Sequence, residues 1–224
     1  MDSRIVSREL WKGVRPLLKA AGWTSFTSRT ARRFCDQRID VISFQSFNTY
    51  LAKRIGSTTY SFGVRLGCFF RFIPEGTPIK MRDGLPMPEE YHCHLRYTIR
   101  KRFPQPECAR TDVFYVDPDG KYLPLVVDGV REGLTTEGFE WFLRFSDMRE
   151  VLRTVQEDFQ SVHNGTWGFG ANPSPVRYLI RGYVALSLGR ADLAINDLIQ
   201  AASSPALERM HAQIRTDLSR IAHN

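Results

Sequence analysis

The chain lacks the features that mark membrane and secreted proteins. None of its apolar runs approaches the roughly 20 residues needed to span a bilayer, and residues 1–6 lack the apolar core of a signal peptide. Its four cysteines (Cys35, Cys68, Cys93 and Cys108) include no Cys-x-x-Cys pair. We therefore expect reduced, structural thiols in a cytoplasmic protein.

Recognisable catalytic motifs are also missing. There is no Gly-x-Ser-x-Gly elbow, and no cysteine stands in a protease-like context. The glycine-rich residues 165–170 lack the Lys-Ser/Thr of a phosphate-binding loop. Glu89 and Glu90 are adjacent in the sequence and are typical of surface acids, not of a catalytic acid–base pair. The sequence thus predicts a protein that is not an enzyme and has no cofactor. An enzyme with an unrecognised site is one alternative.

Positive charge is present and unevenly placed. The formal net charge is +7. Residues 1–110 carry 20 Lys and Arg against 9 Asp and Glu, whereas residues 111–224 carry 11 against 15. This asymmetry indicates either a surface for an anionic partner or two halves that neutralise each other when packed.

Strict alternation of polar and apolar residues is the strongest pattern in the chain. Residues 91–100 place Tyr, Cys, Leu, Tyr and Ile on one face of a strand, and the polar residues on the other face are His92, His94, Arg96, Thr98 and Arg100. A second strand, residues 59–72, repeats the pattern with Arg65 on its polar side. The two strands predict a half-buried sheet with a cationic outer face.

Strand patterns precede helical ones, which predicts an α+β fold with an antiparallel sheet. We expect an N-terminal helix over residues 3–21, kinked or divided at Pro16. The predicted strands are residues 26–35, 39–47, 59–72, 91–100 and 112–116. We divide the chain into a sheet domain (residues 1–162), a Gly/Pro linker (163–175) and a helical hairpin with a terminal helix (176–224), and leave open whether these helices form an independent domain.

Several short motifs stand out in residues 3–160: Leu18 with Gly22-Trp23, Gln45, Gly67, Cys93-His94-Leu95-Arg96 and Glu140-Trp141-Phe142. They resemble the motifs of the bacterial family known as domain of unknown function 4304. The resemblance implies a bacterial cytoplasmic α+β domain. It brings no catalytic residue and no cofactor.

We expect the polar sheet face to recognise an acidic protein through Gln45, Arg65, His92, His94, Arg96 and Arg100. Arginine suits this role because its planar guanidinium forms paired hydrogen bonds with carboxylates. Such a protein would serve as an immunity-type inhibitor or an adaptor. Nucleic-acid binding is the main alternative, since the same arginines could contact phosphates. His92 and His94 could ligate one metal ion, but no third ligand stands at a diagnostic spacing, so we expect no metal site.

Overall fold

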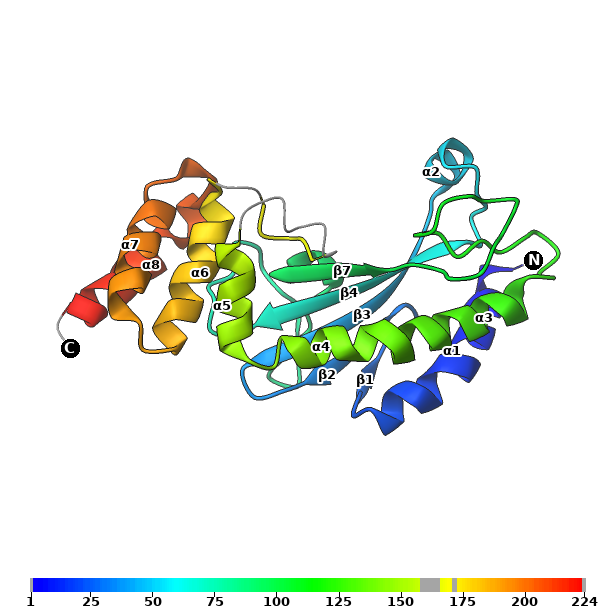
Figure 1. Ribbon diagram of the computed structural model, residues 1–224, viewed down its shortest axis with the longest axis horizontal. Helices are drawn as coiled ribbons and strands as arrows, with labels where there is room; N and C mark the ends of the chain where they lie inside the picture. The colour runs from blue at the N-terminus through cyan, green and yellow to red at the C-terminus, as the bar shows by residue number, and fades with distance from the viewer. Residues whose placement is uncertain (1, 158–165, 171–172, 223–224) are drawn as a thin grey trace.

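The structure is a computed structural model that describes residues 2–157, 166–170 and 173–222. Its centre is a five-stranded antiparallel sheet with the strand order β1-β2-β3-β4-β7 (Figure 1). The strands are β1 (Ser25–Phe26), β2 (Thr30–Phe34), β3 (Arg38–Ser46), β4 (Phe62–Phe70) and β7 (Leu95–Ile99). An N-terminal helix precedes the sheet and several helices follow it, which confirms the predicted α+β class.

Helix α1 (Ser3–Ala20) covers one face of the sheet with an apolar stripe that recurs every four residues. Its buried residues are Val6, Leu10, Val14 and Leu18. Asp2 caps the helix by accepting a hydrogen bond from the Arg4 amide at 2.9 Å. The predicted division at Pro16 is wrong, since one helix runs through this residue. Pro16 lies on the exposed side, where water can hydrate the Lys12 carbonyl that loses its helical partner.

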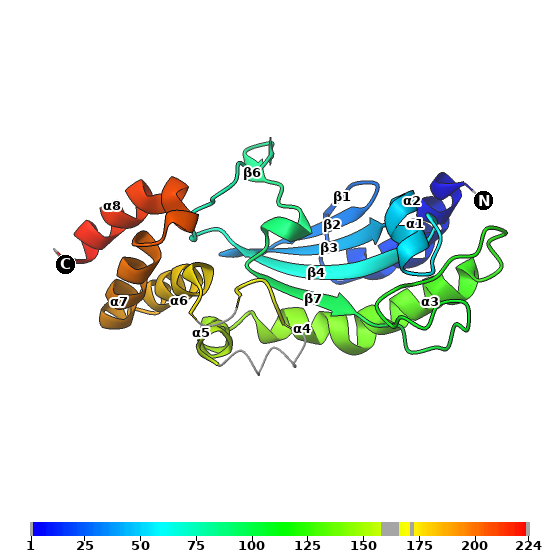
Figure 2. The same cartoon turned by 90° about the horizontal axis from the view of Figure 1, so that it is seen from above.

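A long helical stretch lies beside α1 on the same face of the sheet (Figures 1 and 2). It consists of α3 (Leu123–Gly133), a π-helical segment (Leu134–Gly138) and α4 (Phe139–Arg144). Gly13 of α1 allows the close approach, because a Cβ at this position would lie 2.3 Å from the Cγ1 atom of Val127. The two helices and the sheet enclose the main core, which includes Phe44, Leu66 and Phe142.

The opposite face of the sheet, called the far face below, is covered at one end by the chain that precedes β7. Cys93 lies on Gly67, where an added Cβ would meet the Cys93 Sγ atom at 2.5 Å. Cys93 forms a small second core with Ile39, Val41 and Phe69. The prediction of one alternating strand over residues 91–100 is wrong in its first half. Glu90–His92 form a 3₁₀ turn, η1, and β7 starts only at Leu95, because Cys93 fills the space that Gly67 leaves on the far face.

Two other strand predictions are wrong. The single strand predicted over residues 26–35 is an antiparallel hairpin of β1 and β2, because the chain turns where the Thr27 hydroxyl accepts the Thr30 amide at 3.0 Å. The predicted strand at residues 112–116 is reduced to one bridge between Phe62 and Phe114. The Gln105 side chain accepts the Tyr115 amide, and the Ser61 hydroxyl accepts the Val116 amide, both at 3.0 Å. The side chains of Gln105 and Ser61 thus accept the backbone amides that a neighbouring strand would otherwise pair. Short elements fill the other connections: helix α2 (Thr49–Arg54) and the hairpin of β5 (Met81–Arg82) and β6 (Leu85–Pro86).

The C-terminal helices pack at one end of the sheet and extend the same core (Figure 1). They are α5 (Met148–Gln156), α6 (Pro175–Ser187), α7 (Ala191–Ala202), η4 (Pro205–Met210) and α8 (His211–Ala222). Of the predicted linker, residues 163–165 and 171–172 lie outside the described residues. No helix in the described ranges is long and apolar enough to cross a membrane.

Candidate functional site

Arg96 projects from the far face but is already paired within the protein. Its guanidinium makes two hydrogen bonds to the Glu90 carboxylate, each 2.6 Å long, and lies 3.7 Å from the centre of the Trp167 ring. Trp167 also pairs with the Arg96 backbone through an isolated β-bridge. Glu90 is only 5% exposed, so the pair is largely shielded from solvent. Arg96 is therefore positioned as a structural ion-pair partner.

Arg65 lies next to Arg96 on the far face. Its guanidinium donates a hydrogen bond to the Thr98 hydroxyl and lies 5.9 Å from the Trp167 ring centre. Burial lowers the pKa of Arg65, against the opposing effect of the Glu90 and Asp112 charges. Arg65 keeps part of its surface exposed. Arg65 and Arg96 are thus two predicted site residues that lie side by side on the far face.

The two predicted histidines lie outside β7. His92 belongs to η1, and its Nδ1 atom accepts the Glu89 amide at 3.0 Å. His94 precedes β7, and its Nδ1 atom accepts the Phe70 amide at 3.0 Å. The remaining two predicted residues, Gln45 and Arg100, are exposed. The six residues therefore do not form one open cationic surface, and their predicted role in binding stays a prediction.

A different set of cations is exposed to solvent along α1. These five residues, called the basic ridge, are Arg4, Arg8, Lys12, Arg15 and Lys19, and all are exposed. Their spacing of four, four, three and four residues places them within an arc of about 80° on the helix and over a length of about 22 Å. The stripe is centred about 140° around the helix from the buried apolar face of α1.

Few acids neutralise the basic ridge. Arg8 and Lys12 both reach Glu9, at 3.1 and 3.9 Å, and the Arg8 side chain remains 69% exposed. Arg4, Arg15 and Lys19 have no ion pair with any described residue. An exposed pair of this kind contributes little to folding, so the charges stay free to meet a partner. The ridge was not predicted from the sequence, although its spacing was available there.

A hollow of about 370 Å³ borders the ridge at the edge strand β1. Its apolar lining consists of Phe26, Phe34, Leu85 and Met87. Arg15 and Arg82 also line it, and the Arg15 guanidinium lies 4.7 Å from the centre of the Phe26 ring. We call this feature the edge hollow. It combines an apolar surface with Arg15 of the ridge and with Arg82, which is paired at 3.6 Å with Asp83 in the same lining.

A buried carboxylate near the start of β3 is structural. Asp40 is 0% exposed, and Arg33 and Arg38 each approach it to 2.7 Å. The Cys68 thiol lies 3.7 Å from the same carboxylate. Burial, reinforced by Asp40, raises the pKa of Cys68 well above its ordinary value, which opposes thiolate formation. The cluster therefore has the character of an ion-pair network and not of a nucleophilic site.

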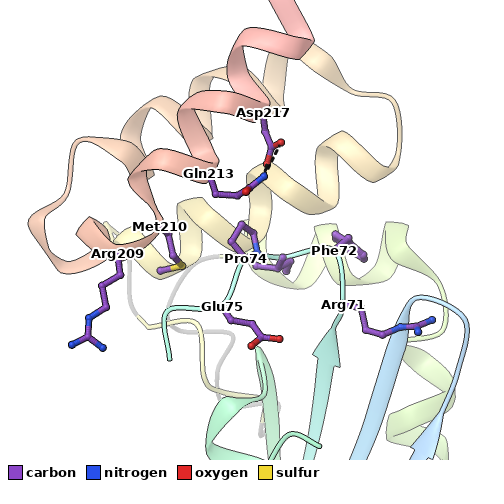
Figure 3. Close-up of a pocket in the computed structure, with 9 residues that line it drawn as sticks. Arg71, Phe72, Pro74, Glu75, Arg209, Met210, Gln213 and Asp217 are labelled. Atoms are coloured by element: carbon purple, nitrogen blue, oxygen red, sulfur yellow. Dashed lines mark hydrogen bonds between the residues drawn. The ribbon is translucent and has the colours of Figure 1, made fainter. Parts of the chain in front are cut away.

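A cleft separates the end of β4 from the C-terminal helices, and part of it is drawn in Figure 3. In this part, of about 460 Å³, Arg71, Pro74 and Glu75 face Met210, Gln213 and Asp217. Asp217 already accepts hydrogen bonds from Gln213 and from the Tyr183 hydroxyl, the latter at 2.8 Å. Its carboxylate is thus engaged in holding α6 to α8.

Within the described residues no group of three or more His, Cys, Asp or Glu side chains is arranged to hold a metal ion. Comparison with known proteins adds no assignment: no family model, curated protein or solved structure matches the chain. The resemblance noted from residues such as Gln45 and Gly67 therefore stays a prediction. Geometry alone distinguishes the candidate sites.

Proposed function

We propose that the protein is a non-catalytic recognition protein that binds an acidic protein partner through the basic ridge of α1. The observation that carries this proposal is the stripe of five exposed cations with Glu9 as its one ion-paired acid among the described residues. The apolar side of α1 is committed to the core. The exposed side is therefore available for long-range attraction of a negatively charged surface.

An acidic protein fits this surface better than a nucleic acid does. The positive charge of the ridge does not continue onto the neighbouring α3, which exposes Asp128 and Glu132 beside Arg131. An extended phosphate backbone would meet these acids, whereas a compact acidic patch would not. No aromatic side chain of α1 is exposed for stacking on a base, since Trp11 donates a hydrogen bond to the Ser28 carbonyl and packs against Phe44.

The edge hollow gives the proposed interface an apolar component. Interfaces gain most of their affinity from a few buried apolar or aromatic anchors, while the charges around them set orientation and association rate. An apolar side chain of the partner would contact Phe26 and Phe34, with an acid beside it facing Arg15. A role as an inhibitor or adaptor would use such a surface.

The test compares three forms of the full chain as bait in lysate of the native host, before and after nuclease treatment. The ridge variant carries Arg8→Glu and Lys12→Glu. The matched control carries Arg215→Glu and Arg220→Glu on α8, which changes net charge equally at exposed helical positions. Like Arg8 with Glu9, Arg220 has a weak surface pair, with Asp217 at 3.4 Å.

We expect one acidic protein to be captured by the wild-type and control baits in both halves of the lysate. The purified partner should bind the ridge variant at least about ten-fold more weakly at low salt, and this difference should shrink as salt rises. Equal capture by the ridge variant would contradict the proposal. Capture that disappears on nuclease treatment would indicate that the ridge binds nucleic acid instead of an acidic protein.

A further inference from the structure

The cleft between the sheet and the C-terminal helices contains a second cavity, of about 220 Å³, that adjoins the part drawn in Figure 3. The two parts share Pro74, Glu75 and Met210. We call the second part the junction cavity. Its apolar wall comes from the far face, from the connection between β4 and η1, and from helices α6 and η4. These residues are Phe69, Ile79, Val176, Leu179, Leu207 and Met210. Cavities of this kind between packed units are common ligand sites.

Two imidazoles, those of His92 and His94, belong to the polar part of the wall, together with Glu75, Thr77 and Tyr91. The Nδ1 atom of His94 accepts the Phe70 amide, so in the neutral ring the proton lies on Nε2. No described residue makes a hydrogen bond with this Nε2 atom. The ring is stacked on Phe69, with 5.1 Å between ring centres, which fixes its orientation. His92 is engaged in the same way through Nδ1, which accepts the Glu89 amide. Both rings thus retain Nε2–H as their one available donor.

These donors are uncharged at neutral pH. Burial lowers the pKa of His94 to about 3 and also lowers the pKa of His92. The residues that line the junction cavity include no lysine or arginine, and Glu75 is their one charged member. An anionic ligand would meet this carboxylate without a compensating cation. A ligand whose polar end is an ammonium group would offer no acceptor to an Nε2–H donor.

We infer that the junction cavity binds a small neutral molecule with an apolar body and a hydrogen-bond acceptor such as a carbonyl oxygen. The apolar body contacts Phe69, Leu179 and Met210, and the acceptor faces Nε2 of His94. The volume is sufficient, since an apolar cavity of about 150 Å³ in another protein holds benzene. Binding here would tie η4 and α6 to the far face, independently of the basic ridge.

The experiment uses two probes of similar shape, acetophenone and isopropylbenzene, of which only the first has a carbonyl. Binding to the full chain is followed by NMR titration, with the His94 ring signals as the local reporter. We expect acetophenone to bind at least about five-fold more tightly than isopropylbenzene, because only the ketone accepts the Nε2–H bond. Equal affinity of the two probes, or no binding of either, would overturn the inference.

Two variants locate the binding. His94→Asn keeps a side-chain oxygen for the Phe70 amide but removes the Nε2 donor, so it should abolish the preference for the ketone. Val176→Trp fills the cavity from a position that is 37% exposed, and it leaves His94 unchanged. It should abolish binding of both probes while the chain stays folded. Persistent binding in Val176→Trp would place the probes elsewhere and reject the cavity. The ridge variant should bind acetophenone as the wild type does, whatever its effect on the protein partner.

Discussion

The basic ridge and the far face both carry arginines, but only one region leaves them available. Arg96 on the far face is held by Glu90 and stacked on Trp167, and its side chain is 21% exposed. Arg8 on the ridge has one ion pair among the described residues, with Glu9, and its side chain is 69% exposed. The comparison teaches that the number of cations in a segment does not indicate a binding surface. What decides is whether the fold provides each cation with its own buried acid.

The largest expected effect on folding comes from breaking the far-face pair. Arg96→Met leaves the Glu90 carboxylate, which is 5% exposed, without its two donors. We expect a loss of about 3 kcal/mol in the free energy of unfolding, since removal of one partner leaves a buried charge uncompensated. Urea unfolding at neutral pH measures this loss.

The double variant Glu90→Gln/Arg96→Met is the control for that loss. Because it removes the stranded charge, it should recover a large part of the stability. A single variant that loses less than about 1 kcal/mol would show that Arg96 behaves like a surface residue. The contrast between the far face and the ridge would then fail.

The sequence predicted the helix–sheet order and the polarity of the central strands because these follow from spacing alone. Arg65 is on the far face as the alternation in β4 predicted. The covering of that face could not be predicted, since it depends on Cys93 filling the space over Gly67 and on Glu90 reaching Arg96 after a 3₁₀ turn. The alternation of residues 91–100 does not show which of these residues meet β4 or each other, so these contacts could not be predicted from it.

The basic ridge was overlooked for a different reason. Its spacing is legible in the sequence, but the same helix was assigned only by its apolar stripe. The structure adds the missing information, which is that α3 and the sheet leave the charged side of α1 uncovered.

The second expected effect is a dependence of stability on pH that comes from the far-face side and not from the ridge. His94 has a pKa of about 3 in the folded protein, against an ordinary value of 6.5. Between these values the unfolded chain binds a proton that the folded chain does not. Stability should therefore fall as pH falls from 6.5, by at most about 1.4 kcal/mol per pH unit from this group.

The variant His94→Asn isolates this contribution, because every other titrating group is shared with the wild type. Urea unfolding at pH 6 and at pH 5 should show a loss that is about 1 kcal/mol larger for the wild type than for His94→Asn. Equal losses would mean that the imidazole becomes protonated in the folded protein. The ridge contributes nothing here, since its lysines and arginines keep their charge throughout this range.

The smallest expected effect is that of Arg8→Met, the same substitution as Arg96→Met but placed on the ridge. Glu9 keeps 35% of its side chain exposed and stays hydrated when Arg8 is lost. We expect the free energy of unfolding to change by less than about 0.5 kcal/mol, and by less still at high salt, which screens surface charges. Urea unfolding at low and high salt measures this change.

A loss above about 1 kcal/mol would mean that the ridge cations stabilise the fold as Arg96 does. They would then be less available to bind a partner. A negligible loss, together with weaker partner binding by the ridge variant, would assign the ridge cations to recognition and the far-face pair to stability.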